Sequence, residues 1–401
     1  MDFSFSDEQQ QIADLAKQIF ADKATHERLK QIERGPGPRF DRDLWAEIAK
    51  AGLLGIAVPQ ELGGGGLGFL EIALIIEQVG RTTAPIPFLE TLVLGALPIA
   101  EFGSAAQRQR WLPRVAEGKA VLTAALVEGQ GDSTSSDTTA RDASPGTAAL
   151  GSSLRTTAGA HGAATTARAQ DNGWRISGTK ICVPAGEIAD CVLVPAATGD
   201  GTVGVFLVDP TAPGVRVEPL VTTSAQPEAR IVLDDVRLGA GDVLGDPANG
   251  ARIVEWISER ATAALSSLAL GVCEQALALT AEYIKTRKQF DVPLATFQAV
   301  GQRTANAYID TEAIRLTAWQ AAWRISAGLP AAAHVAVAKF WAAEGGQRVV
   351  HTAQHLHGGI GVDRDYPLHR YFLYAKELEL TLGGATAQLL KIGKALADHP
   401  A

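Results

Sequence analysis

The chain has 401 residues, 46% of them hydrophobic, which is enough for two or three domains with substantial cores. Its formal net charge of -8 argues against nucleic acid as the main partner, and no basic patch with interleaved aromatic residues occurs. The three cysteines, Cys182, Cys191 and Cys273, lack metal-ligand spacing and are too few for a disulfide framework, so they favour a reducing compartment.

The N-terminal residues and the lengths of the apolar runs indicate the cellular location of the protein. Residues 1–5 lack a basic region that leads into an apolar core, so we expect no secretory signal. We also expect no uninterrupted apolar span of membrane length. The sequence therefore predicts a soluble cytoplasmic protein.

The N-terminal region, residues 1–119, has the pattern of a helical domain. Ser6 is a natural N-cap, and two acidic residues follow it in the first turn, where the helix dipole favours negative charge. Apolar residues at helical spacing predict further helices over 44–53 and 70–79. Between these two helices, the glycine-rich stretch 58–66 lacks the Lys-Ser/Thr of a phosphate-binding loop, so we interpret it as a flexible connector.

The central region, residues 120–238, changes to short β-rich runs bounded by Gly, Pro and Asp, and their spacing predicts a small barrel or sandwich. The runs cover residues 120–127, 174–183, 191–195, 204–208, 215–219 and 229–233. A Ser/Thr/Ala/Gly-rich segment at about 130–172 has almost no large apolar residues. Because it has too little to bury for a core of its own, we expect a long mobile excursion.

The C-terminal region, residues 239–401, returns to helical spacing. Apolar residues form two stripes over 265–284, which is the pattern of a mostly buried helix, and the spacing resumes after a break and runs to about Ile325. Pro293 shows that the first helix has ended, so an antiparallel helix pair is predicted. The layout of the whole chain is therefore α+β, with a β-domain between two helical regions.

The break between the two long helices contains adjacent cations, Arg287 and Lys288. Both lie at a helix C-terminus, where the dipole favours positive charge, and a guanidinium there could grip a phosphate with two hydrogen bonds. A solvated turn is the alternative interpretation.

This layout, together with five short motifs, resembles the acyl-CoA dehydrogenase family over nearly the whole chain. The order and spacing of the motifs carry the resemblance, because each is weak alone. They are Val58-Pro59 with its glycine loop, Gly178-Thr179-Lys180, Arg287-Lys288-Gln289-Phe290, Phe297-Gln298 and His357-Gly358-Gly359-Ile360-Gly361. The resemblance implies a middle β-barrel or sandwich and a C-terminal four-helix bundle.

The resemblance also implies that FAD lies between the β-domain and the C-terminal helices. A second subunit supplies an Arg-x-x-Phe turn and a Gln-x-x-x-Gly-Gly loop to the diphosphate and adenosine in such proteins. On this chain, Arg287 would clamp the pyrophosphate, and glycines would let backbone N–H groups approach closely. The other residues that the resemblance assigns to the cofactor are Gln289, Phe290, Gln298, Gln354, Gly358 and Gly359.

The implied reaction removes an α-proton from an acyl-CoA thioester while a β-hydride passes to the flavin, so it needs a carboxylate base. The commonest base position of the family holds Leu382 or Gly383 here, and neither can abstract a proton. A second family position is a Glu before Arg, which Glu259 and Arg260 match in letters. An ungapped match instead puts Ala261 there, and a two-residue offset turns a helical side chain by roughly 200°. A gap near the helix start would restore the match to Glu259, which makes it our candidate catalytic residue, with a solvated carboxylate on the helix face as the alternative.

The flavin side departs from the family pattern as well. The Thr-Glu-Pro and Gly-Ser-Asp signature becomes residues 127–133, and Trp-Ile-Thr/Ser becomes Cys182-Val183-Pro184. Val127 and Pro184 cannot supply the expected hydroxyl groups. These losses resemble those of subunits that pair with a catalytic paralogue in the heterotetrameric dehydrogenases of steroid side-chain breakdown.

The first hypothesis is thus FAD-dependent α,β-dehydrogenation of a bulky, steroid side-chain-like acyl-CoA by one subunit of a heteromeric enzyme. A non-catalytic or FAD-completing subunit of the same fold, and a flavin-dependent oxidase or monooxygenase, are the alternatives. The implied partners are an acyl-CoA substrate, a paralogous subunit or a second copy of this chain, and an electron acceptor. His355 and His357 share no spacing with a third ligand, so no metal site is predicted.

Overall fold

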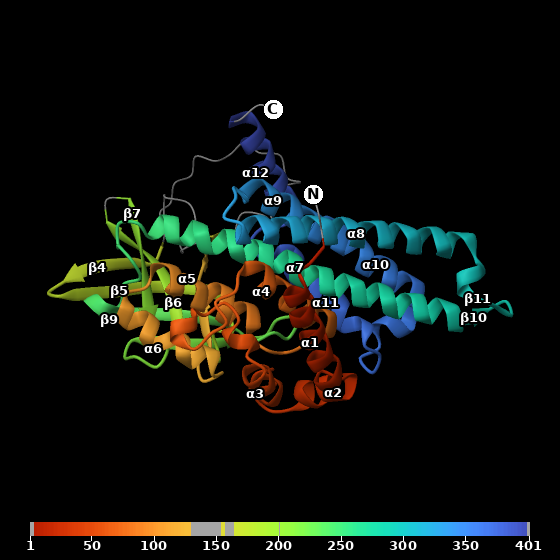
Figure 1. Cartoon of the computed structure of the whole chain (residues 1–401), viewed down its shortest axis with the longest axis horizontal. Helices are drawn as coiled ribbons and strands as arrows, with labels where there is room; N and C mark the ends of the chain where they lie inside the picture. Colours follow the sequence, from red (N-terminus) through yellow and green to blue (C-terminus); the bar gives the residue numbers. More distant parts are fainter. Residues whose placement is uncertain (1–3, 130–153, 157–163, 200, 399–401) are drawn as a thin grey trace, which may run out of the picture.

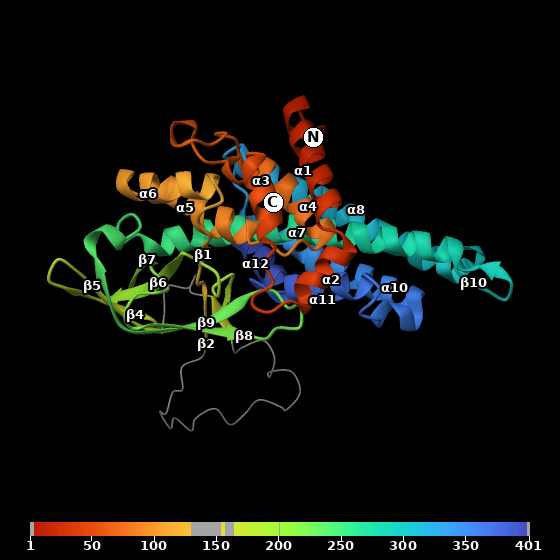
Figure 2. The same cartoon turned by 90° about the horizontal axis from the view of Figure 1, so that it is seen from below.

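The computed structural model describes residues 4–129, 154–156, 164–199 and 201–398. Figures 1 and 2 show a sheet at one end of the molecule and long C-terminal helices that run away from it, with α1 to α4 near the middle of these helices and α5 and α6 close to the sheet. The N-terminal helices are α1 (Asp7–Lys23), α2 (His26–Arg34), α3 (Arg42–Lys50), α4 (Phe69–Thr82), α5 (Leu97–Phe102) and α6 (Ala105–Ala116). Ser6 caps α1 as predicted, because its hydroxyl accepts from the backbone of Gln9.

The glycine-rich loop before α4 is not the flexible connector that the sequence predicted. Its backbone N–H groups at Gly65 and Gly66 donate to the carbonyls of Gly55 and Val58, 2.9 Å away in each case. At Gly64, a Cβ atom would lie 2.1 Å from the carbonyl oxygen of Val58. The glycines therefore permit a close backbone approach, which fixes the loop against the preceding turn.

The central region forms one curled sheet in the strand order β1-β6-β4-β5-β9-β8, with β7 paired to β6. The strands are β1 (Leu122–Ala124), β4 (Thr166–Gln170), β5 (Gly173–Pro184), β6 (Cys191–Gly199), β7 (Thr202–Val208), β8 (Val215–Leu220) and β9 (Glu228–Gly239). A separate pair joins β2 (Val127–Gly129) to β3 (Leu154–Thr156).

Strand β4 corrects the expectation of a long excursion up to about residue 172. It pairs along its whole length with β5, and its alanine at position 167 is buried in the core of the sheet. A strand of small and polar residues gives almost no apolar signal, since its partners in the sheet provide the hydrogen bonds and the burial. The rest of the predicted excursion, residues 130–153 and 157–163, lies outside the described residues.

The predicted antiparallel helix pair is confirmed as α7 (Gly250–Thr286) and α8 (Gln298–Ser326). A short hairpin of β10 (Lys288–Gln289) and β11 (Val292–Pro293) joins them. The helices α9 (Ala332–Phe340), α10 (Gly346–His357), α11 (Leu368–Leu380) and α12 (Ala385–Asp398) complete the C-terminal region. The α+β fold of two helical regions around a sheet domain is confirmed.

Helix α7 is the axis of the molecule. At Gly271 a Cβ atom would lie only 1.9 Å from the carbonyl oxygen of Glu77, so α4 and α7 cross in close backbone contact. By length and composition α7 is apolar enough to cross a membrane, which amends the expectation that no such span exists. Within the protein, however, 78% of its most apolar window is buried, as in a core helix.

Candidate functional site

The hairpin after α7 displays the first group of predicted cofactor residues. Arg287 ends the helix, and its N–H donates to the carbonyl of Tyr283 over 2.8 Å. Phe290 and Asp291 have φ values of +55° and +68°, which is the two-residue turn that matches the twist of a tight hairpin. This turn leaves the Phe290 side chain 88% exposed, edge-on to the ring of Phe297 at 6.2 Å.

Gln298 is the first residue of α8 and is exposed at the base of the same hairpin. Arg287 and Gln289 are exposed too, and no acidic partner of Arg287 is recorded among the described residues. A solvent-facing guanidinium, two amides and an aromatic ring therefore lie within one connection between helices. Such a set fits the phosphate and the ring of a nucleotide.

The second group of predicted cofactor residues lies where α10 passes into the turn η7 (Gly358–Val362). Gly358 has φ +63° and ψ -141°, a conformation that essentially only glycine adopts. The Gln354 amide donates to the carbonyl of Gly358 over 3.3 Å, and a Cβ at Gly361 would lie 2.6 Å from the same amide nitrogen. Gln354 thus braces the turn, while Gly358 and Gly359 expose their backbone.

His357 joins the two groups. Its ring is buried, with Nδ1 2.8 Å from the carbonyl of Ala353 and Nε2 3.1 Å from the hydroxyl of Tyr366. It stacks on Tyr283 at 4.4 Å, in the last turn of α7 before Arg287. Burial lowers the pKa of His357, which favours the neutral ring. Both groups therefore belong to one end of the bundle, remote from the sheet in Figures 1 and 2.

The wall of the sheet where the resemblance places the flavin has a different character. Val127 lies on β2, and Cys182, with φ +47°, lies at a register shift of β5. Pro184 offers only its carbonyl, which accepts from the Thr123 hydroxyl over 2.6 Å. The side chains of Val127, Cys182 and Pro184, which form what we call the wall, carry methyl groups, a thiol and a proline ring, and none of the three carries a hydroxyl.

A buried ion pair holds the two strands of this wall together. Lys180 on β5 donates to the Glu128 carboxylate on β2 over 2.5 Å, and the N–H groups of Ala164 and Thr165 also donate to that carboxylate. Lys180 is fully buried, and burial lowers its pKa to about 8 while Glu128 opposes the change. The ion pair thus links β2, which carries Val127, to β5, which carries Cys182 and Pro184.

Three carboxyl groups from elements far apart in the sequence interact with one another, and two of them also interact with the Cys182 thiol. Glu377 on α11 interacts electrostatically with Glu90 and Glu228, and the Cys182 thiol donates to Glu228. Burial raises the pKa of Glu377 to about 8 and that of Glu90 to about 7. We call Glu90, Glu228 and Glu377 the acidic cluster. Burial thus favours the protonated, uncharged forms of these carboxyl groups.

The position of the usual family base is a turn that packing and hydrogen bonds hold in place. Leu382 has φ +56° and packs against the main core, and Gly383 has φ +96°. The Gln388 amide donates to the carbonyls of both residues, and buried Lys339 donates to the carbonyls of Leu378 and Glu379 just before them. The turn keeps its shape without a carboxylate.

Glu259, the candidate base, lies in the first third of α7 and is half-buried. Burial raises the pKa of its carboxyl group, and Arg260, 3.5 Å away, opposes the change. The Arg260 guanidinium stacks on the ring of Trp256 at 3.6 Å. The recorded contacts of Glu259 thus run along its own helix, and its role in catalysis stays a prediction.

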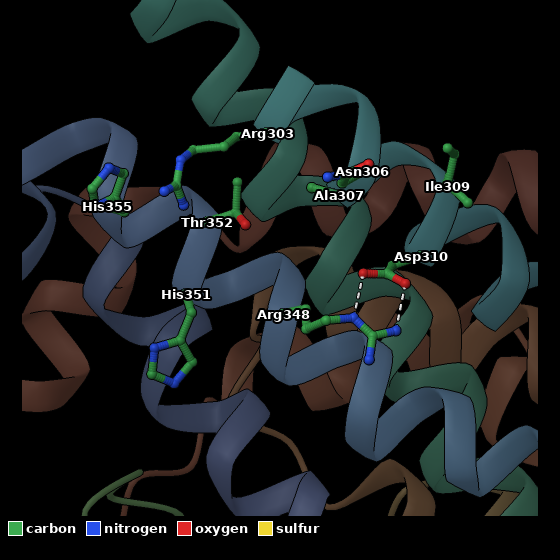
Figure 3. A pocket seen from close by; sticks show the side chains of 9 residues that line it. All are labelled: Arg303, Asn306, Ala307, Ile309, Asp310, Arg348, His351, Thr352 and His355. Atoms are coloured by element: carbon green, nitrogen blue, oxygen red, sulfur yellow. Dashed lines mark hydrogen bonds and ion pairs between the residues drawn. The ribbon is translucent and has the colours of Figure 1, made fainter. Parts of the chain in front are cut away.

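Sequence reasoning overlooked a groove between α8 and α10, shown in Figure 3. Its volume is about 580 Å³, and Arg303, His351 and His355 line it. The only sequence signal was nearness in the chain, since Arg303 follows Gln298 by five residues and His355 follows Gln354 directly. Neither in this groove nor elsewhere among the described residues is a group of three or more His, Cys, Asp or Glu side chains placed to hold a metal ion.

Comparisons with known proteins match the whole length of the chain. Models of the N-terminal, middle and C-terminal domains of acyl-CoA dehydrogenases match residues 6–119, 150–236 and 249–397. The curated protein acyl-CoA dehydrogenase FadE27 of Mycobacterium tuberculosis is 39% identical over 409 residues, covering 100% of both chains.

Two solved structures are similar over almost every residue. A chain of the ChsE4-ChsE5 complex from Mycobacterium tuberculosis has a TM-score of 0.88 and 39% identity, with 100% of both chains covered. A variant of the Tcur3481-Tcur3483 steroid ACAD has a TM-score of 0.84 and 42% identity, with 98% of both chains covered. Our chain belongs to the acyl-CoA dehydrogenase family, which confirms the predicted enzyme class and FAD as the cofactor of its fold.

Proposed function

We propose that this protein is one subunit of a heteromeric acyl-CoA dehydrogenase that acts on a bulky, steroid side-chain-like acyl-CoA. Its part is to complete the FAD site of a paralogous subunit. The observation that carries the proposal is the contrast between an exposed cofactor edge, at Arg287 and Gly358, and an altered wall in the sheet domain, at Val127, Cys182 and Pro184.

The edge fits the outer part of the cofactor. Arg287 would neutralise phosphate charge, Gln289, Phe290 and Gln298 would line the nucleotide, and the backbone at Gly358 and Gly359 would contact its far end. The wall fits the flavin ring poorly, because the side chains of Val127 and Pro184 donate no hydroxyl hydrogen bonds. When bound, FAD accepts the hydride that leaves the β-carbon of the acyl chain.

The comparisons support the assignment of a partner and a substrate class. One of the two solved structures named above is the ChsE4-ChsE5 complex, and the other is the Tcur3481-Tcur3483 steroid ACAD. The turn at Leu382 and Gly383 offers no general base, so we assign the α-proton to a carboxylate of the partner subunit. We also propose that an electron-transfer protein accepts the electrons and that the enzyme works in the cytoplasm.

Co-expression with a candidate paralogue tests this assignment. We expect a complex that retains flavin through gel filtration and whose flavin absorbance bleaches when a steroid side-chain CoA thioester is added without oxygen. Full activity and stoichiometric FAD in the chain purified alone would contradict the proposal. Turnover that consumes oxygen without an added electron acceptor would instead indicate an oxidase.

Two variants of this chain test cofactor binding by Arg287 separately from proton abstraction by Glu259. Arg287→Ala should weaken FAD binding to the complex about 10- to 100-fold, which is the value of one or two charged hydrogen bonds, while Lys288→Ala in the same hairpin should have a small effect. Glu259→Gln should leave turnover within a few-fold of the wild type. If Glu259→Gln abolished turnover while FAD stayed bound, this chain and not its partner would carry the base.

A further inference from the structure

A cavity of about 320 Å³ lies where the N-terminal helices α1, α2 and α4 meet the C-terminal helices α7 and α11. Its size is that of a site for a small organic molecule. It contains none of the residues assigned above to the cofactor or to proton abstraction. We call it the junction cavity.

The charged groups that line the junction cavity are positive. Lys17, Arg81 and Arg370 line it, whereas no Asp or Glu among the described residues does. Arg370 donates to both oxygens of Glu33 over 2.6 and 2.8 Å. Arg81 donates to Glu274 over 2.6 Å, and neither of these carboxylates lines the cavity. Lys17 is exposed, and no ion pair of its ammonium group is recorded in the part of the chain that the structure describes.

The partners of Arg370 leave part of its charge and of its donors unused. Glu33 also pairs with Arg39 over 3.1 Å, so two guanidinium groups share one carboxylate. The third recorded bond of Arg370 goes to Nδ1 of His26 over 2.8 Å. Since a guanidinium carries five N–H groups, two remain beyond these three bonds. An excess of positive charge therefore lies beside the cavity.

Thr83 provides an independent observation at the same place. It follows α4 with φ +49°, a left-handed conformation that is strained for a β-branched residue. Only 1% of the residue is exposed, yet its hydroxyl has no hydrogen-bond partner within the described ranges. A buried hydroxyl without a partner costs free energy, and backbone strain concentrates at functional sites. Because Thr83 lines the cavity, an oxygen of a ligand there could accept this hydrogen bond.

The other walls fit an organic molecule. Leu29 and Leu279 line the cavity and offer apolar contacts for a short carbon chain. The amide of Gln275 lines it too, and no hydrogen bond of this side chain is recorded in the described residues. Cations, a hydroxyl and an amide beside apolar groups are the chemistry that a small organic anion requires.

We propose that the junction cavity binds a small organic oxyanion. Lys17 and Arg370 hold its negative charge, and the Thr83 hydroxyl donates to one of its oxygens. The bound anion joins α1 and α4 to α11, and it thereby stabilises the junction between the N-terminal and C-terminal helices. Carboxylates and phosphate esters share this chemistry, and the two probes of the test distinguish them. The site is independent of the proposed function, because it shares no residue with the cofactor edge.

Calorimetric titration of the full chain with succinate and with glycerol 3-phosphate, at constant ionic strength, tests the site. We expect at least one of them to bind once per chain, succinate alone indicating a carboxylate ligand and glycerol 3-phosphate alone a phosphate ester. Lys17→Met should weaken this binding about tenfold and Thr83→Val about three- to tenfold. Lys23→Met removes an exposed lysine of α1 that does not line the cavity, and it should bind like the wild type. No binding of either anion, or binding that Lys17→Met and Thr83→Val leave unchanged, overturns the proposal.

Thermal unfolding separates binding from a purely structural role of Thr83. Without an anion, Thr83→Val should be at least as stable as the wild type, because valine keeps the β-branched shape and removes a hydroxyl without a partner. With the anion that binds, the unfolding temperature of the wild type should rise with concentration, and that of Thr83→Val should rise much less. A loss of stability in Thr83→Val without anion, with equal anion-dependent rises in both proteins, would show that the hydroxyl serves only the fold and would refute its part in the site.

Discussion

The cofactor edge and the sheet wall differ in how their polar groups are satisfied. At the edge, Arg287, Gln289 and Gln298 point their polar ends to solvent, and a strained glycine turn keeps backbone groups open. At the wall, Glu128 and Lys180 satisfy each other in the interior, and the acidic cluster is largely desolvated. The edge therefore offers polar groups that a ligand can contact, whereas the charged pair at the wall is already satisfied within the protein.

The buried pair behind the wall should produce the largest effect. Lys180→Met leaves the Glu128 carboxylate buried without its cation, so the free energy of unfolding should fall by about 3–5 kcal/mol. Arg216→Met removes an exposed partner of Glu218 and should cost far less, because water screens an ion pair at the surface. Urea denaturation of both variants measures the two free energies of unfolding. Similar losses of stability would show that the buried ion pair contributes no more than the surface pair.

The glycine turn sharpens the comparison at the other end. Gly358→Ala forces a side chain into a conformation that only glycine adopts readily, so it should lower stability by about 1–3 kcal/mol and release FAD from the complex. Gly359 has no positive φ and open space around it, so Gly359→Ala should keep stability and lose only FAD affinity. Thermal unfolding and flavin retention separate the two. Unchanged FAD affinity in both would remove the turn from the cofactor site.

The acidic cluster should make stability depend on pH. The pKa of Glu377 is about 8 in the folded protein and near its usual value in the unfolded chain, so folding retains a proton that the unfolded chain releases. The resulting penalty is absent below about pH 4, grows as pH rises and is complete above about pH 8.

Glu377→Gln should therefore stabilise the protein by about 1–2 kcal/mol more at pH 8 than at pH 5. The amide keeps an acceptor for the Ser224 hydroxyl, so lost hydrogen bonding does not obscure the effect. Glu47→Gln, at an exposed position of α3, provides the control. Chemical denaturation of the variants and the wild type at both pH values measures the change in the free energy of unfolding. An equal effect at pH 5 and pH 8 would show that Glu377 is charged in the folded state at both.

Much of the candidate site followed from local sequence. The break at Arg287 was readable because the apolar spacing stops and a proline follows, and the motif at His357-Gly358-Gly359 could be located by its letters alone. The acidic cluster could not be found in that way, since Glu90, Glu228 and Glu377 come from three separate elements. Each looks like an ordinary surface carboxylate until packing removes its water.

The sequence by itself determined the order of the helical and β-rich regions, the two long helices, and the positions of the cofactor motifs, because hydrophobic period and turn residues act over a few neighbours. Tertiary structure decided that β4 joins the sheet, that the glycine loop is held rather than free, and that Arg303 and His355 line one groove. A periodic pattern states which face of an element is buried. Only the packing of distant elements decides what each face meets.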